Sequence, residues 1–144
     1  MPEITKTRTQ FRNINVLNDL PGYRLPLAGW VSILHRISGA LMFLLLPLVI
    51  WMFDTSVSSE ISYARFVGAF AHGLGWVPGW LLKLVCLALI WAYLHHLVAG
   101  LRHVFMDIRP QATSRSFGQR SATLTLVISL TLSMLLGLKL FDLY

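Results

Sequence analysis

The sequence predicts an all-α membrane protein with three transmembrane helices, its N-terminus in the cytoplasm and its C-terminus in the periplasm. Hydrophobic residues make up 56% of the 144 residues and charged residues only 12%, with a mean hydropathy of +0.65. Three long segments are almost free of charge, and basic residues flank them. No ordinary soluble domain of this size has such a composition. We therefore expect a multi-pass integral membrane protein.

The first predicted helix covers residues 30–53. Its length of about 36 Å suffices to cross a hydrocarbon core of about 30 Å with some tilt. Pro47 lies inside it and is expected to kink it. Residues 1–23 contain basic residues, lack apolar periodicity and end in turn-forming residues, so we expect an exposed cytoplasmic arm. Residues 24–144 then form the membrane domain.

The second and third predicted helices cover residues 79–106 and 121–141. Pro78 precedes the second helix, and the third begins an uncharged stretch rich in Leu, Thr and Ser. Between the first two helices, Ser58, Ser59 and Glu60 are expected to cap a short helix that lies along the membrane interface. Tryptophans near both ends of that loop are typical of an interfacial belt: Trp51, Trp76 and Trp80.

The distribution of basic residues predicts the orientation. Nine lie on the side of the N-terminus, against three on the other side. Because positive residues favour the cytoplasmic side, the N-terminus is expected there. The nine are Lys6, Arg8, Arg12, Arg24, Arg36, Arg102, Arg109, Arg115 and Arg120, and the three are Arg65, Lys83 and Lys139.

Composition also limits the chemistry available to this chain. The net charge of +6 does not indicate nucleic-acid binding, because the basic residues flank apolar segments and form no patch with interleaved aromatic residues. Cys86 is the single cysteine, so neither a disulfide nor thioether attachment of heme through a Cys-x-x-Cys-His motif is available. The polar remainder is too short for a dicarboxylate or flavin domain. Such chemistry must belong to partner subunits.

A polar cluster opens the first helix. Ser32, Arg36 and Gly39 are four and seven residues apart, which places a hydroxyl, a guanidinium and bare backbone on one helical face, with His35 beside it. Polar groups at the edge of a bilayer are costly. The cluster therefore indicates either a binding site or a positive flank that fixes orientation.

A histidine face follows on the second helix. His96 and His103 are seven residues apart and lie on nearly one face, at depths that differ by about 10.5 Å. Gly100 between them leaves room for a flat group such as a porphyrin, or for a neighbouring helix. His103 and Asp107 are within hydrogen-bonding reach, and Arg102 adds a cation, so these groups can hold carboxylates of a cofactor.

Neutral imidazole is an axial ligand of heme iron, whereas an isolated membrane histidine often only bonds a neighbouring helix. The number of histidines favours a heme ligand. His35 is expected nearer the membrane surface than His96, and His72 in the outer loop is too distant. A partner helix is therefore the simpler source of a second ligand.

Two sequence blocks carry a resemblance to a known family. Ser32-Ile-Leu-His-Arg-Ile-Ser-Gly39 and His96-Leu-Val-Ala-Gly-Leu-Arg-His-Val-Phe-Met-Asp107 resemble the cytochrome b556 membrane-anchor subunits of bacterial succinate dehydrogenase. Three helices at matching spacing extend the resemblance over residues 24–142. The resemblance implies an electron path from succinate, through a flavoprotein subunit and an iron-sulfur subunit, to ubiquinone.

The resemblance also implies roles for individual residues. His96 would ligate heme b, with the other ligand supplied by a second membrane anchor subunit. Ser32 and Arg36 would form part of the ubiquinone site, and their donors suit quinone carbonyls. His35, Arg36 and His103 would lie around the heme propionates, with Gly100 beside the heme.

The resemblance also implies a place in the bacterial inner membrane. The sequence departs from the family pattern at two points. Only Arg24-Leu-Pro26 stands where relatives often have a longer motif before the first helix. His95 stands where relatives often have tyrosine, which leaves two adjacent candidates for the iron, of which the motif spacing favours His96. The rival functions are a fumarate reductase anchor and a non-redox assembly or transport subunit.

Overall fold

A computed structural model describes residues 22–109 and 114–142. Within these ranges the chain forms no strand, and its elements are the helices α2 (Leu27–Leu44), α3 (Leu46–Val57), α4 (Glu60–His72), α5 (Gly79–Ile108) and α6 (Arg115–Leu140). Three of them, α2, α5 and α6, are long and apolar enough to cross a membrane. The predicted all-α fold with three membrane spans is confirmed. The predicted arm lies almost wholly outside the described residues.

The first predicted helix is interrupted. Where the sequence indicated one kinked helix over residues 30–53, α2 ends at Leu44 and α3 begins at Leu46, with Leu45 in a non-helical conformation. Pro47 lies in the first turn of α3, where its missing N–H needs no partner. The proline therefore starts a second helix instead of bending a single one.

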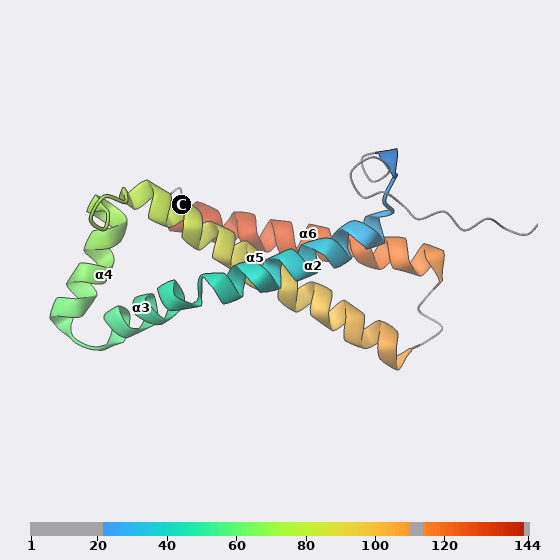
Figure 1. Ribbon diagram of the computed structural model, residues 1–144, viewed down its shortest axis with the longest axis horizontal. Coiled ribbons are helices and arrows are strands. Elements are labelled where there is room, and N and C mark those ends of the chain that lie inside the picture. The colour runs from blue at the N-terminus through green and yellow to red at the C-terminus, as the bar shows by residue number, and fades with distance from the viewer. Residues whose placement is uncertain (1–21, 110–113, 143–144) are drawn as a thin grey trace, which may run out of the picture.

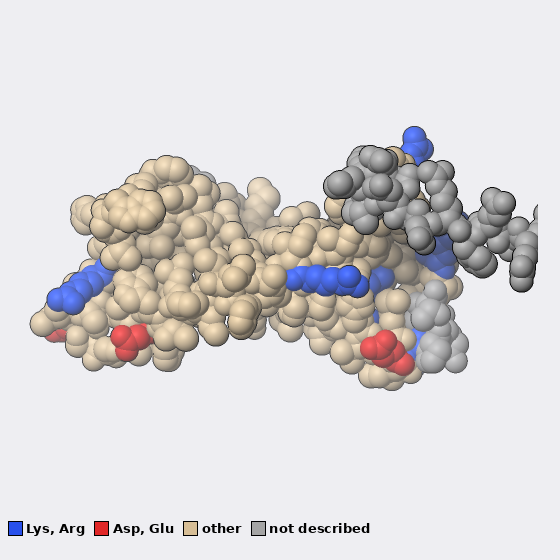
Figure 2. All heavy atoms as spheres, viewed as in Figure 1, with Lys and Arg blue, Asp and Glu red and all other residues tan. Residues whose placement is uncertain are grey.

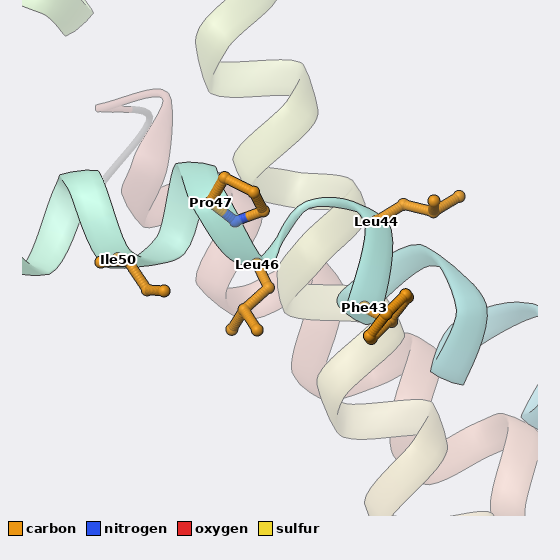
Figure 3. A pocket seen from close by; sticks show the side chains of 5 residues that line it. All are labelled: Phe43, Leu44, Leu46, Pro47 and Ile50. Carbon is orange, nitrogen blue, oxygen red and sulfur yellow. The ribbon is translucent and has the colours of Figure 1, made fainter.

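The break leaves an apolar hollow on the surface. Figure 3 shows Phe43 and Leu46 on either side of the break and Pro47 at the start of α3. Phe43 and Ile50, which also line the hollow, are 75% and 58% exposed. Such surface suits contact with lipid chains, because it offers no polar group to bind.

Helix α5 lies at the centre of the bundle. It packs against both α2 and α6, which also contact each other, and Figure 1 shows α2 crossing α5. Val31, Ala99 and Ala122, one from each of the three spans, form a buried cluster near the start of α2. Small residues at these crossings let the backbones approach closely, as is usual for helices in lipid.

Helix α6 begins at Arg115, before the predicted start at residue 121. Ser114 caps it by accepting a hydrogen bond from the Phe117 amide at 3.4 Å. Of its hydroxylated residues, Thr125, Ser129 and Ser133 are buried against the bundle, whereas Thr123 and Thr131 are exposed. Thr125 and Ser133 are therefore at a helix contact and at the same time bond carbonyls of their own helix.

The connection between the spans forms α4, as predicted. Ser59 caps this helix and exchanges hydrogen bonds with Ser62, which completes a capping box. Gly73 ends it with a φ of +99°, a conformation that glycine adopts without strain. Trp76 in the following turn is 91% exposed, in keeping with a place at the membrane interface.

Candidate functional site

Three predicted site residues meet between α2 and α5. The rings of His35 and His96 stack with centroids 4.0 Å apart and planes 15° from parallel. The His103 ring lies 5.2 Å from that of His35 and is tilted by 52°. The structure therefore brings the histidine of the α2 motif and two histidines of the α5 motif into one histidine cluster.

Hydrogen bonds fix the orientation of the His96 ring. Its Nδ1 lies 3.0 Å from the backbone oxygen of His35 and 3.2 Å from Oγ of Ser38. The Ser38 hydroxyl itself donates to the same carbonyl at 2.8 Å. Because a carbonyl can only accept, Nδ1 carries the proton in this arrangement. The lone pair of neutral His96 is then on Nε2, the nitrogen left for a metal.

The Nε2 atoms of the adjacent residues His95 and His96 differ in how far they are buried. Among the described residues, Nε2 of His95 is the buried side-chain nitrogen without a hydrogen-bond partner. Nε2 of His96 also makes no hydrogen bond in these ranges, but unlike Nε2 of His95 it is not fully buried. His96 therefore offers an accessible lone pair, and His95 does not.

Gly39 allows α2 to approach the His96 ring. A Cβ added at Gly39 would lie 2.9 Å from Cε1 of His96, closer than real Cβ contacts come. The same test at Gly100 places a Cβ 3.5 Å from Nε2 of His35, an ordinary contact. The space beside Gly100 is thus bordered by His35 of the histidine cluster. Of these two glycines, Gly39 is the one where a side chain would collide with the His96 ring.

Ser38 is a site residue that the sequence argument missed. It is fully buried and joins His35 to His96 through the bonds above. Its position three residues after His35 and directly before Gly39 is the signal that could have found it, because it places the hydroxyl on the face toward α5.

His95 points toward the other neighbour of α5. It is fully buried, its Nδ1 lies 3.2 Å from Oγ of Ser129 on α6, and its ring stacks on Trp91 with centroids 5.5 Å apart. His95 therefore belongs to the packing of the three spans.

Ser32 and Arg36 keep their donors free. Ser32 is half-buried and Arg36 is exposed on α2, and neither side chain has a hydrogen-bond partner in the described part of the chain. They are neighbours on the helix surface because they are four residues apart. Both can donate to a ligand that reaches this end of α2.

The predicted carboxylate-binding group on α5 is divided by the structure. Arg102 is directed at α6, where it donates to Oγ of Ser121 and to the carbonyl of Gly118. Within residues 22–109 and 114–142, His103 and Asp107 form no hydrogen bond. The expectation that Arg102 acts beside His103 is wrong, because the two point to different sides of α5.

The arrangement of the rings limits how the histidine cluster could bind a metal. Over the ranges that the structure describes, no three His, Cys, Asp or Glu side chains converge on one point, and the His35 and His96 rings lie as stacked plates. One accessible imidazole nitrogen with a fixed tautomer fits one axial position of a heme.

Comparison with known proteins identifies the family of the chain. Residues 12–136 match the family of succinate dehydrogenase/fumarate reductase transmembrane subunits. Two proteins named succinate dehydrogenase cytochrome b556 subunit are similar: that of Paracoccus denitrificans is 39% identical over 85 residues, and that of Coxiella burnetii is 34% identical over 90 residues. A third, from Rickettsia felis, is 27% identical over 106 residues, which are 73% of this chain and 77% of that protein.

The match to the first two relatives is partial. It covers 59% of this chain and 60% of the Paracoccus protein, and 62% of this chain and 67% of the Coxiella protein. The family model spans most of the sequence, including all three membrane helices from α2 to the last turns of α6. The chain therefore belongs to the family of succinate dehydrogenase/fumarate reductase transmembrane subunits.

Proposed function

We propose that this chain is the membrane anchor subunit of a succinate:ubiquinone oxidoreductase and passes electrons from an iron-sulfur subunit to quinone. The observation that carries the proposal is the His96 ring, whose Nδ1 is bonded to a backbone carbonyl and whose Nε2 remains accessible. The cytochrome b556 name of the relatives supports a b-type heme at this position. The flavoprotein subunit would hold the succinate site.

His96 would supply one axial ligand of that heme, and a second anchor subunit would supply the other. The heme would give the subunit a one-electron carrier within the membrane. His35 and His103 lie next to His96 and offer ring nitrogens to the propionates, and Arg36 adds a positive charge. Gly100 lies beside His35 and keeps side-chain bulk out of this space.

Ser32 and Arg36 would bind ubiquinone. Quinone carbonyls accept hydrogen bonds, and reduction to quinol adds two electrons and two protons. The free donors of the two side chains can orient the ring, and the guanidinium stabilises negative charge that develops on a carbonyl oxygen. Their place at the start of the first span gives protons a short path from the adjacent aqueous side.

The same proposal includes the orientation of the chain. Basic residues favour an N-terminus in the cytoplasm and a C-terminus in the periplasm. A reporter fused after Tyr144 should then report the periplasm, and one inserted near Ala112 should report the cytoplasm. A cytoplasmic signal from the C-terminal fusion would contradict the three-span arrangement.

A fumarate reductase anchor is the second candidate, because the family description covers both enzymes. The test is to purify the complex that forms around this chain and to measure succinate-driven ubiquinone reduction, fumarate reduction by quinol, and the reduced-minus-oxidised visible spectrum. A b-type spectrum, together with ubiquinone reduction that is faster than fumarate reduction, supports the proposal. Absence of any heme band would favour a non-redox assembly or transport role.

A further inference from the structure

A cavity at one end of the bundle is not used by the histidine cluster. It has a volume of about 580 Å³ and lies where α2 begins, α5 ends and α6 begins. Among the described residues its lining includes three arginines and no acidic side chain: Arg24 just before α2, Arg102 on α5 and Arg115 on α6. We call it the arginine cavity. Figure 2 shows basic side chains and an acidic side chain at this end of the molecule, next to a broad uncharged surface.

Arg102 is the unusual member of the cavity. It is only 9% exposed, and its hydrogen bonds go to two neutral acceptors, Oγ of Ser121 at 2.9 Å and the carbonyl of Gly118 at 3.3 Å. A guanidinium has five N–H donors, and within residues 22–109 and 114–142 most of those on Arg102 have no partner. Burying a positive charge without a negative partner is unfavourable.

No carboxylate in the described ranges neutralises this charge. The ion pair there joins Lys83 to Asp142 at 3.1 Å, at the opposite end of α5 and α6. Arg24 and Arg115 are exposed and add like charges to the cavity. Three arginines on one cavity, with no acidic residue among its described lining, favour an anion with several acceptor oxygens.

A phosphate group fits these donors. Arginine pairs with phosphate through two parallel hydrogen bonds, and Ser114 and Gln119 add neutral polar groups to the lining. The cavity also lies over the first turn of α6, where backbone N–H groups favour negative charge. Ser114 already caps one of these groups, so the arginines are the main attraction.

The position of the cavity indicates where the phosphate comes from. Pro26, Ala28 and Met106 supply an apolar part of its lining. Nearby on α5, Phe105 and Ile108 are 49% and 71% exposed, which gives acyl chains a surface to follow. Clusters of basic residues at the ends of membrane helices attract anionic headgroups. We propose that the arginine cavity binds the phosphate of an anionic phospholipid.

The test uses the purified complex in detergent after lipid has been removed. Phosphatidylglycerol, phosphatidylcholine and inorganic phosphate are added separately, and native mass spectrometry counts bound lipid while thermal unfolding reports stabilisation. The variants are Arg24→Gln and Arg115→Gln, whose side chains are exposed and are not needed for packing. Arg120→Gln is the matched control, since Arg120 is exposed on the same helix but does not line the cavity.

We expect phosphatidylglycerol to bind and to raise the unfolding temperature, and phosphatidylcholine to bind more weakly. Each cavity variant should lower phosphatidylglycerol affinity about fivefold, because one basic residue near an anionic surface contributes about that factor. The control should bind like wild type. The proposal does not depend on heme or quinone.

Four results would overturn it. The first is that phosphatidylglycerol and phosphatidylcholine bind equally well, and the second is that Arg120→Gln and Arg24→Gln lose the same amount of phosphatidylglycerol affinity. The third is that inorganic phosphate binds but phosphatidylglycerol does not, and the fourth is that no lipid binds at all. Inorganic phosphate that displaces phosphatidylglycerol from the wild-type complex, but not from Arg24→Gln, would support the cavity as the phosphate site.

Discussion

Two adjacent histidines on α5 face different neighbours. His95 is sealed between the spans and contacts Ser129 of α6, whereas His96 stacks on His35 of α2 and keeps Nε2 accessible. Neighbouring residues on a helix point about 100° apart, so the step from one to the next moves the side chain from one interface to another. The same type of side chain is thus a packing group at residue 95 and a candidate ligand at residue 96.

The largest effect is expected from Gly39→Val, which tests whether packing against α2 holds the His96 ring in place. The new side chain would occupy the place of the His96 ring, because a Cβ alone lies 2.9 Å from Cε1. Overpacking costs about 1–3 kcal/mol, and here it would displace the proposed ligand. We expect most of the heme absorbance to be lost from the purified complex.

Ala40→Val is the control for that change. Ala40 is the next residue on α2 and is exposed, so the same enlargement should leave the spectrum as in wild type. Equal heme content in the two variants would show that α2 does not hold the His96 ring.

The His95 side is tested by Ser129→Ala, which removes the partner of His95 Nδ1. A buried polar group left unpaired costs about 1–3 kcal/mol, so the unfolding temperature of the complex should fall. Heme content should not change. Thr131→Ala, at an exposed position on the same helix, should leave the temperature unaltered. A change of the heme spectrum in Ser129→Ala would show that the His95 contact influences the heme, contrary to the separate roles assigned to His95 and His96.

The three spans could be predicted from the sequence because uncharged stretches of membrane length need no knowledge of packing. The start of α6 could not, because hydropathy ignores residues 115–120, which contain two arginines but continue the helix from the Ser114 cap. The break at Leu45 was missed for a related reason. A proline predicts a disturbance, but the surrounding packing decides between a kink and a new helix.

Within the site, the stacking of His35 on His96 could not be predicted either. The membrane helices are apolar on most faces, so hydrophobic periodicity does not set their rotation about the axis. The contact between His95 and Ser129 depends on the same rotation. Motif spacing grouped His96 with His103 correctly, whereas Arg102 was wrongly assigned to that group because its contact with α6 has no local signal.

A smaller effect is expected from Ser38→Ala. The variant keeps the bond from His96 Nδ1 to the His35 carbonyl but loses the buried hydroxyl between them. A net hydrogen bond is worth about 0.5–1.5 kcal/mol, so heme should remain with a shifted reduction potential. Potentiometric titration measures the shift, and a potential equal to that of wild type would show that Ser38 does not influence the ligand.

The smallest effect is expected from Ser32→Ala, which tests the proposed quinone donors. Loss of one neutral hydrogen bond should raise the KM for ubiquinone by up to about tenfold. Heme content and succinate oxidation by a soluble dye should stay unchanged. Ser32→Thr should restore the KM, because it keeps the hydroxyl. An unchanged KM in Ser32→Ala would place quinone elsewhere.

The most direct test of the account compares His96→Gln with His95→Gln in the purified complex by reduced-minus-oxidised spectroscopy. Both variants replace an imidazole by an amide of similar polarity at adjacent positions, and glutamine at residue 95 can still bond Ser129. We predict loss or a marked shift of the low-spin b-type bands in His96→Gln and a nearly unaltered spectrum in His95→Gln. The opposite pattern would contradict the assignment of His96 as the ligand and of His95 as a packing residue.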